Sequence, residues 1–343
     1  MTKTFRKLFL VILTLSLVGV FAAAEFNVGV VFATGGLGDR SFNDSVFEGL
    51  TRAKEELDIT LDYVEPSSIA EFEGHERAFA QSGIYDLIVC LGFDQAESLK
   101  KVAGEYPNQK FVLIDAAISV PNVASIVFKD YEKAFLVGAL AAQLTTDTRN
   151  FRQMNAQNRI GIVGGMEIPL IKTFVAGYTA GAKYVEPKTD VSVAYVGGWS
   201  DPAKAKEQAL LMYQRGVDIV FQAAGGSGLG VFKAARQVNK YAIGADSNQN
   251  YIEPNNILFS AVRRLGNVVV DQINSAMNGT WEGGDFCYGL KEEAMGYDTT
   301  ENSFTIPEEY ILKIEEIRAK IISGEIVVPS TLEEVDAFLK NAK

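Results

Sequence analysis

Short apolar strands alternate with helical patterns along most of this chain, and this alternation constrains its fold more than any other feature. In the first unit, an apolar run over residues 26–32 leads through the glycine-rich stretch 35–44 (GGLGDRSFND) into a helical pattern over 46–57. Strands that alternate with helices of about 10–15 residues predict βαβ units and a parallel sheet. We therefore expect an α/β fold with a ligand site at the carboxyl ends of its strands.

A break in the alternation divides the chain into two parts. Residues 145–158 are polar and lack periodicity, and the alternation begins again at residue 159. We expect two Rossmann-like lobes, each with its own parallel sheet, and a ligand cleft between them, because ligand pockets favour domain interfaces. The predicted first lobe comprises residues 25–130 and about 250–285. The predicted second lobe comprises residues 131–249 and about 286–343.

Composition and charge narrow the class of protein. The chain has 343 residues, of which 48% are hydrophobic and 22% charged, so it is expected to be globular with room for two domains. Its formal net charge of −11 argues against a nucleic-acid partner, because phosphate contacts require clustered lysine and arginine. With two cysteines and one histidine, zinc sites and histidine-dependent triads are also disfavoured, and we expect no metal.

The first 24 residues form a separate segment. Lys3, Arg6 and Lys7 precede an apolar run over 8–24 that ends in three alanines. This pattern predicts a signal peptide over residues 1–24, cleaved after the last alanine, with a single membrane-spanning anchor as the alternative. The cleavage point has no cysteine, so we expect a soluble, unlipidated protein in the periplasm or another extracytoplasmic compartment.

Polar and aromatic side chains follow the predicted strands in both halves. Asp39, Asp115 and Asp246 could act as paired carboxylates in acid–base chemistry, but no nucleophile or metal motif accompanies them. Carboxylates at strand ends also accept hydrogen bonds from sugar hydroxyls. Phe42 and Trp199 each follow a glycine-rich strand end, one in each half, and we expect them to clamp a flat guest.

The remaining candidates are less specific. Phe93 and Phe174 are weaker aromatic candidates, and Phe174 is equally compatible with a core position. One of the pair Arg263 and Arg264 is expected to reach the cleft. Residues 226–230 read GxGxG and depart from the dinucleotide fingerprint GxGxxG, so no cofactor is predicted. The predicted ligand-binding residues are Asp39, Phe42, Asn43, Phe93, Asp115, Phe174, Trp199, Gly225, Asp246 and Arg263.

Five stretches of the chain together carry a family resemblance: GGLGDRSFND (35–44), FLVGALAA (135–142), IGIVGGMEIPLIKTFVAGYTAGAKYV (160–185), VGGWSDPAKAKEQALLMYQRGVDIVFQAAGGSGLGVFKAA (196–235) and IGADSNQ (243–249). These stretches resemble the basic membrane protein family of ABC-transporter substrate-binding proteins. They extend over nearly the whole chain after the signal segment. The resemblance implies the type I periplasmic-binding fold and a receptor for purine nucleosides that serves an ABC permease.

The resemblance also implies roles for individual residues. Phe42 would stack on the base, and Trp199, where the family usually has phenylalanine, would supply the opposite face. Asp115, Gly225 and Asp246 match cleft positions where ribose hydroxyls are held. Arg263 stands where the family usually carries lysine.

Three classes of function remain open from the sequence. The first is a monomeric transport receptor that closes on a nucleoside and delivers it to a membrane permease. The second is an enzyme acting on nucleosides, such as a hydrolase, and the third is a sensor domain that feeds a signalling partner. Another small polar ligand, such as a sugar, is an alternative within the same fold.

Overall fold

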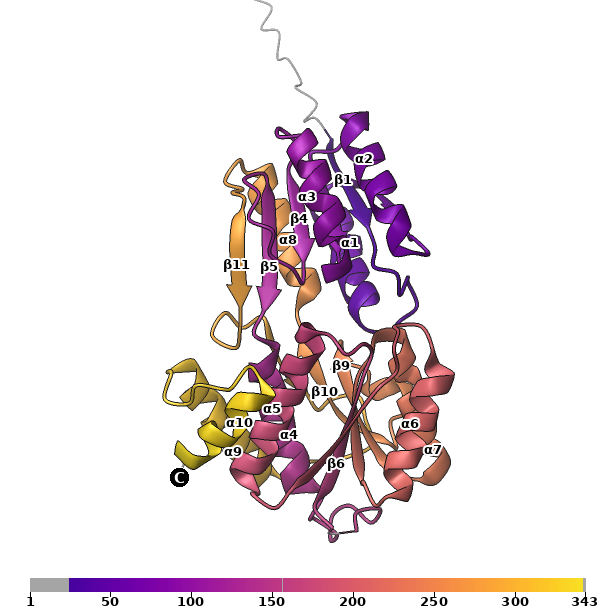
Figure 1. The fold of residues 1–343 in the computed structure, drawn as a ribbon, viewed down its shortest axis with the longest axis vertical. Helices are drawn as coiled ribbons and strands as arrows, with labels where there is room; N and C mark the ends of the chain where they lie inside the picture. The colour runs from indigo at the N-terminus through magenta and orange to yellow at the C-terminus, as the bar shows by residue number, and fades with distance from the viewer. Residues whose placement is uncertain (1–24, 156, 342–343) are drawn as a thin grey trace, which may run out of the picture.

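The computed structural model describes residues 25–155 and 157–341, so the predicted signal peptide lies outside the described residues. The described chain forms two α/β lobes, the first above the second in Figure 1. The first lobe contains a parallel six-stranded sheet in the order β11-β5-β4-β3-β1-β2. Its strands are β1 (Phe26–Val31), β2 (Ile59–Val64), β3 (Leu87–Leu91), β4 (Phe111–Ile114), β5 (Val123–Phe128) and β11 (Gly284–Tyr288). Its helices are α1 (Phe42–Leu57), α2 (Phe72–Ser82), α3 (Ala96–Glu105) and α8 (Leu265–Met277).

The second lobe repeats this architecture. Its six-stranded sheet has the order β12-β10-β9-β8-β6-β7 and is parallel except for the edge strand β12, which runs antiparallel to β10. Its strands are β6 (Arg159–Gly164), β7 (Asp190–Tyr195), β8 (Ile219–Ala223), β9 (Tyr241–Asp246), β10 (Ile257–Arg263) and β12 (Met295–Asp298). Its helices are α4 (Asp130–Leu144), α5 (Pro169–Val185), α6 (Pro202–Gln214), α7 (Leu229–Val238), α9 (Glu308–Ile322) and α10 (Leu332–Asn341).

Within the described residues the chain passes between the lobes at three points, and one of them differs from our expectation. The first passage, between β5 and α4, lies at residue 129, close to the predicted boundary. We predicted a return to the first lobe near residue 250, but β10 pairs with β9 and β12 in the second sheet. The return therefore follows Arg263, and β11 completes the first sheet before the chain passes back to β12.

Local sequence signals explain several helix ends. Proline occupies the first position of α5 and of α6, where its missing N–H costs no intrahelical hydrogen bond. The Oδ1 atom of Asp201 accepts a hydrogen bond from the backbone N–H of Lys204 at 2.9 Å and caps α6. Gly83 and Asn239 end α2 and α7 in the left-handed conformation, which is usual for a helix carboxyl terminus.

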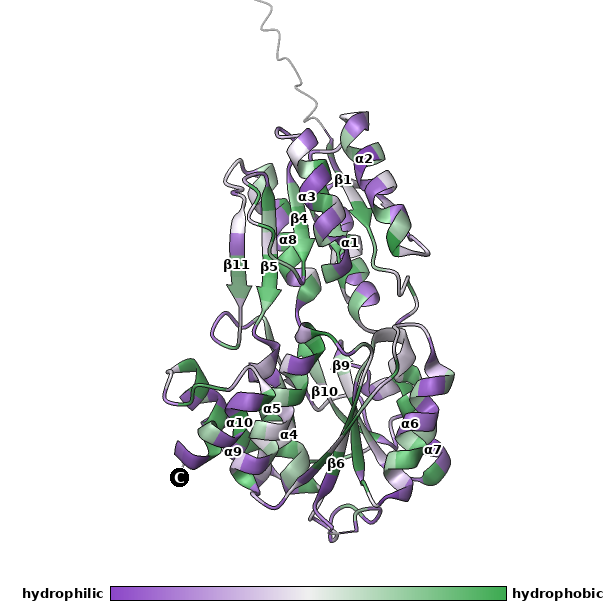
Figure 2. Cartoon of the chain, viewed as in Figure 1, coloured by the Kyte–Doolittle hydropathy of each residue, from purple (hydrophilic) through white to green (hydrophobic). Residues whose placement is uncertain are grey.

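The central strands supply the cores. All residues of β3, β4 and β8 are buried, as expected for parallel strands covered by helices on both faces. Figure 2 shows β4 and its neighbour β5 as mainly hydrophobic, whereas the helices carry both hydrophilic and hydrophobic residues. Among the described residues, no helix combines the length and the apolar character needed to cross a membrane.

Helices α4 and α5 pack unusually closely because glycine lies at their contacts. A Cβ atom on Gly177 or Gly181 of α5 would overlap a backbone carbonyl oxygen of α4, at Tyr131 and Phe135 respectively. A Cβ on Gly138 of α4 would likewise overlap the carbonyl oxygen of Tyr178. The two helices therefore touch backbone to backbone. This matters for the site because both helices begin beside the cleft.

Candidate functional site

A cleft between the two lobes contains about 660 Å³ of space that no protein atom fills, and this figure includes space open to solvent. Every predicted ligand-binding residue, from Asp39 to Arg263, lines this cavity, together with residues that the sequence analysis did not select. The structure thus brings the strand ends of both lobes together around one space. That these residues contact a ligand stays a prediction.

Asp39 determines the shape of the glycine-rich loop and the start of α1. Its Oδ1 accepts hydrogen bonds from the backbone N–H groups of Ser41 at 2.8 Å and Asp44 at 3.2 Å. Its Oδ2 accepts from the backbone N–H of Asn43 at 2.9 Å and from the side-chain amide of the same residue at 3.1 Å. The Oδ1 of Asn43 in turn accepts from the backbone N–H of Ala33 at 3.1 Å. These contacts satisfy donors that a helix start leaves free and tie the loop to the end of β1.

Trp199 forms part of the cavity wall in the second lobe. A Cβ on Gly165 would overlap the indole ring, so the ring lies directly on the glycine backbone. The carbonyl oxygen of Trp199 accepts a hydrogen bond from the backbone N–H of Ser227 at 2.8 Å. Gly225, beside it, has a φ of +54°, which glycine adopts without steric cost. Trp199 therefore lines the cavity with its indole ring packed against the backbone of Gly165.

The other aromatic candidates lie in different surroundings. Phe42 is half-buried at the first position of α1, and the guanidinium carbon of Arg263 lies 5.3 Å from its ring centroid. Phe174 on α5 is 3% exposed and also lines the cavity. The sequence was compatible with either a core or a site position for this residue, and the structure places it in both. Phe93 is half-buried in the turn that follows β3.

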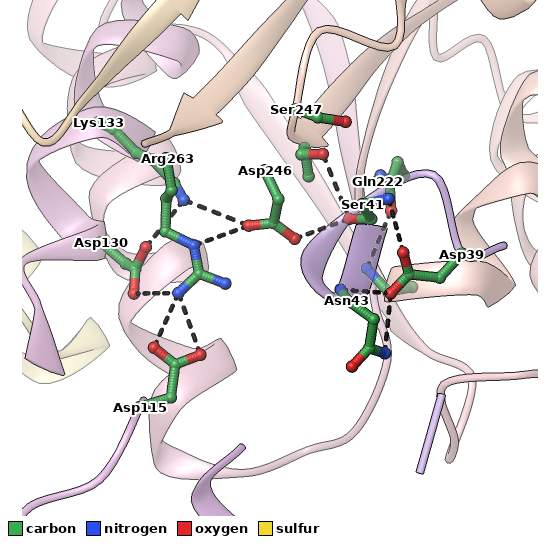
Figure 3. Close-up of polar contacts among 12 residues, drawn as sticks. Asp39, Ser41, Asn43, Asp115, Asp130, Lys133, Gln222, Asp246, Ser247 and Arg263 are labelled. Atoms are coloured by element: carbon green, nitrogen blue, oxygen red, sulfur yellow. Dashed lines mark hydrogen bonds and ion pairs between the residues drawn. The ribbon is translucent and has the colours of Figure 1, made fainter. Parts of the chain in front are cut away.

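Arg263, at the end of β10, holds carboxylates from both lobes (Figure 3). Its Nε donates to Oδ1 of Asp246 at 2.8 Å, and its Nη1 donates to both oxygens of Asp115, at 2.9 and 3.1 Å. The same Nη1 lies 3.6 Å from Oδ2 of Asp130, the first residue of α4. None of these side chains is more than 9% exposed. The guanidinium therefore links the end of β4 in the first lobe to the end of β9 in the second.

The cluster shifts the pKa values of its members. Burial raises the pKa of Asp115, and Asp130 and Asp246 add to this rise while Arg263 opposes it. Burial also acts on Asp246, but Arg263 and Lys133 together hold the pKa of that carboxyl below its usual value. Burial lowers the pKa of Arg263, yet the surrounding carboxylates raise it overall, so the guanidinium stays charged.

The glycine-rich loop of the first lobe also contacts the second lobe directly. The hydroxyl of Ser41 donates to Oδ2 of Asp246 at 2.7 Å. The carbonyl oxygen of Arg40, whose φ is +55°, accepts from the hydroxyl of Ser247 at 2.8 Å and from the side-chain amide of Gln249 at 2.7 Å. Because these bonds join the two lobes across the cleft, the structure represents a closed arrangement.

The two strand-end aspartates share an uncommon backbone conformation. Asp115 follows β4 with a φ of +70°, and Asp246 ends β9 with a φ of +67°. Non-glycine residues enter this left-handed region at an energetic cost, and such residues concentrate at functional sites. The equivalent placement in the two lobes means that the carboxylates approach the cavity from opposite sides.

The sequence analysis missed two kinds of residue. The first kind comprises residues that line the cavity, such as Asp94 and Ile171. The sequence could have indicated Asp94, because it directly follows the candidate Phe93 in the same glycine loop. Asp130 and Lys133 lie behind the lining residues and form an ion pair of 2.8 Å. They gave no separate signal, since charged residues in the first turn of a helix are common and normally exposed.

We expect stability to increase as the pH is lowered from about 7.5 to 5.5. Burial raises the pKa of Asp39 to about 6, against backbone hydrogen bonds that lower it, and it also raises the pKa of Asp115. In the first lobe, burial raises the pKa of Glu76 to about 7, although a hydrogen bond from Ser98 opposes this shift. The native protein therefore takes up protons at a higher pH than the unfolded chain, whose carboxyls titrate near pH 4. The expected gain in the free energy of unfolding is on the order of 1–3 kcal/mol.

Urea unfolding at a series of pH values measures this effect. The variant Glu76→Gln should have a higher free energy of unfolding than the wild type at pH 7.5. Its free energy of unfolding should rise less on acidification, and the residues that line the cavity are unaltered in this variant. A free energy of unfolding that falls steadily between pH 7.5 and 5.5 would contradict the raised pKa values.

Comparison with known proteins identifies relatives over almost the whole chain. Residues 26–332 match the family described as ABC transporter substrate-binding protein, PnrA-like. Basic membrane protein A of Borreliella burgdorferi is 32% identical in an alignment that covers 98% of this chain and 99% of that protein. An uncharacterized lipoprotein of Pyrococcus abyssi is also 32% identical, with coverages of 93% and 88%. A solved ABC transporter solute-binding protein from Aeropyrum pernix K1 superposes with a TM-score of 0.82 at 31% identity, over 92% of this chain and 99% of that chain.

These matches confirm the family resemblance and the type I periplasmic-binding fold. Substrate-binding proteins of ABC importers act outside the cytoplasm, with a small-molecule ligand and a membrane permease as partners. The lipoprotein name of the Pyrococcus relative differs from our expectation of an unlipidated protein, which depends on residues outside the described part. The chain belongs to the basic membrane protein, PnrA-like family of ABC transporter substrate-binding proteins.

Proposed function

We propose that this protein captures a purine nucleoside for an ABC importer and that its lobes close on the ligand. The observation that carries the proposal is the composition of the cavity wall. One aromatic ring from each lobe, Phe42 and Trp199, lines the same cavity as the strand-end carboxylates Asp115 and Asp246. A nucleoside joins a flat base to a polyhydroxyl sugar, and this wall offers a partner for each part.

The aromatic rings favour a ligand with a flat face. Stacking of a base on an aromatic side chain contributes about 1–3 kcal/mol, and every base has such a face. The indole ring of Trp199 packs against Gly165 at the cavity wall, and this contact limits its movement before a ligand binds. A free sugar would use only part of this surface. It is the second candidate, because the carboxylates suit its hydroxyls equally well.

The carboxylates favour a guest that donates hydrogen bonds. Asp39, Asp94, Asp115 and Asp246 all line the cavity, and an ionised carboxylate only accepts hydrogen bonds. Each carboxylate has about four lone-pair sites, so Asp115 and Asp246 retain acceptor capacity beyond their contacts with Arg263. Ribose hydroxyls can fill this capacity. A phosphate group would instead bring negative charge toward several buried carboxylates.

A competition series tests this proposal with inosine, hypoxanthine, ribose and inosine monophosphate. We expect inosine to bind most tightly and the monophosphate to bind at least tenfold more weakly, about 1.4 kcal/mol or more. Hypoxanthine should lose about 1–3 kcal/mol, because it leaves buried acceptors without donors. Tighter binding of ribose than of inosine would favour a sugar receptor, and equal binding of the monophosphate would exclude the proposed role of the carboxylates.

We further propose that the ligand leaves chemically unchanged and that the receptor acts as a soluble monomer. The relatives are substrate-binding proteins, which supports a binding role. Incubation of the protein with inosine should yield no free hypoxanthine by chromatography. Release of the base in proportion to protein concentration would instead favour a nucleoside hydrolase.

Replacement of Trp199 by alanine should weaken inosine binding by about 1–3 kcal/mol, the scale of one stacking contact. The effect on stability should be smaller, because the ring is only partly buried. Isothermal titration calorimetry measures the affinity, and thermal unfolding measures the stability.

The second tryptophan, Trp281, provides the matched control. It lies between α8 and β11 in the first lobe and does not belong to the cavity wall. The variant Trp281→Phe should retain wild-type affinity, and inosine should still change its fluorescence, which then comes from Trp199 alone. An unchanged affinity in Trp199→Ala would show that this ring does not stack on the ligand.

A further inference from the structure

Lys133 is an ammonium group buried directly behind the ligand cavity. It lies in the first turns of α4, and its side chain is 0% exposed. Its Nζ atom lies 2.8 Å from Oδ1 of Asp130, 3.8 Å from Oδ1 of Asp246 and 4.5 Å from the ring centroid of Phe174. Burial of a charged group is costly unless its surroundings compensate it. The position of this lysine therefore calls for an explanation.

Each neighbour of Lys133 connects it to the cavity. Asp246 and Phe174 are part of the cavity wall. Asp130 lies 3.6 Å from Arg263, which in turn holds Asp115 of the first lobe. Figure 3 shows Lys133 and Asp130 on the side of Arg263 that is away from Asp39. The ammonium group of Lys133 thus lies close to the carboxylate of Asp246 and to the ring of Phe174. Asp130 lies between Lys133 and the guanidinium of Arg263.

The charges around Lys133 explain why its own charge matters. It faces Asp130 from its own helix, Asp246 from β9 and Arg263 from β10, while α5 presents the ring of Phe174. Burial lowers the pKa of Lys133, and Asp130 and Asp246 act against this effect. With Asp115 included, three carboxylates share two cations. Without Lys133, the same three carboxylates would share Arg263 alone.

We propose that Lys133 is a positioning residue for the ligand site, whose charge keeps Asp246 ionised and lets Arg263 join Asp115 to Asp246 across the lobes. Without this charge, one buried carboxyl would take up a proton near neutral pH, or Arg263 would shift toward Asp130. The first change would remove a hydrogen-bond acceptor from the site, and the second would break the link that Arg263 forms between Asp115 and Asp246. The effect on ligand affinity depends on the function proposed above, whereas the effect on proton uptake does not.

Three variants separate the charge of Lys133 from its packing. Lys133→Met keeps most of the side-chain volume and removes the charge. Lys133→Arg keeps the charge. The double variant Asp130→Asn/Lys133→Met removes one charge of each sign, so its cluster has the same net charge as the wild type. If Lys133 only fills space, the single and double methionine variants should behave alike.

Inosine calorimetry at pH 7.5 gives the first measurement. We expect Lys133→Met to bind about tenfold more weakly, and the double variant to return to within about threefold of the wild type. Lys133→Arg should recover part of the affinity. Lys240→Met is the matched control, because Lys240 pairs with buried Asp218 elsewhere in the same lobe. It should lose stability without losing affinity.

The pH dependence of unfolding gives a second measurement that requires no ligand. In Lys133→Met a carboxyl pKa rises in the native state, so the deficit in melting temperature relative to the wild type should grow between pH 5.5 and pH 8. The double variant should run parallel to the wild type. If Lys133→Met does not fold, Asp130→Asn alone should lower the remaining carboxyl pKa values and reverse the trend.

The outcomes distinguish the two proposals. If the wild type does not bind inosine but the unfolding profiles differ as expected, the nucleoside assignment is wrong and the role of Lys133 stands. If the wild type binds inosine while both methionine variants show the same affinity and parallel unfolding profiles, Lys133 serves packing alone and our inference is overturned.

Discussion

Replacement of Arg263 by methionine is expected to reduce inosine affinity by on the order of a hundredfold and to lower the free energy of unfolding by about 3–5 kcal/mol. The guanidinium is the direct contact between Asp115 of the first lobe and Asp246 of the second. Its loss leaves Asp115, Asp130 and Asp246 buried with Lys133 as the nearby cation of this cluster. Isothermal titration calorimetry and urea unfolding measure the two effects.

Two further arginine variants serve as controls for this experiment. Arg264→Met changes the adjacent arginine, whose side chain is exposed, and should leave affinity and stability close to the wild type. Arg263→Lys keeps the charge but offers a single ammonium in place of the planar fork, and it should give an intermediate affinity. If Arg263→Met behaves like Arg264→Met in both measurements, the guanidinium does not hold the lobes or the ligand site together.

Replacement of Gly177 by alanine is expected to lower the free energy of unfolding by about 3 kcal/mol or more, at the upper end of overpacking effects. The added Cβ would overlap the backbone carbonyl oxygen of Tyr131, which cannot rotate away as a side chain can. The helices α4 and α5 would have to separate. Since α4 carries Lys133 and α5 carries Phe174, we also expect weaker inosine binding.

A glycine in an open environment provides the control. Gly104 lies in α3, and a Cβ there would meet no atom within 4 Å. Gly104→Ala should therefore stabilise the protein by about 0.5–1 kcal/mol, the usual gain from replacing glycine in a helix. Thermal and urea unfolding compare the two variants. Equal stability of Gly177→Ala and Gly104→Ala would mean that α4 and α5 can move apart without cost.

In the closed arrangement, the loop that Asp39 shapes contributes both to the fold of the first lobe and to the contacts between the lobes. Asp39 accepts its hydrogen bonds within the first lobe, where it shapes the loop before α1. That loop then presents Ser41 to Asp246 and the carbonyl group of Arg40 to Ser247. A ligand that strengthens contacts on both sides of the cavity would favour this arrangement over an open one.

The sequence by itself determined the α/β class, the repetition of this architecture in two lobes, and ten of the residues that line the cavity, but not Asp94 or Ile171. The reason is geometric: in a parallel sheet the carboxyl ends of the strands meet at one edge. Residues that follow strands in each half, such as Asp115 and Asp246, therefore converge without any knowledge of long-range contacts. The same reasoning selected Phe42 and Trp199.

Only the tertiary structure decided which sheet takes β10 and which charges are buried together. The local pattern of an apolar strand is the same in either lobe, and its partners are fixed by hydrogen bonds to β9 and β12. Likewise, Lys133 follows helical periodicity like a surface lysine. It becomes part of the site because α4, β9 and β10 bring Asp130, Asp246 and Arg263 to the same point, where burial makes each charge depend on the others.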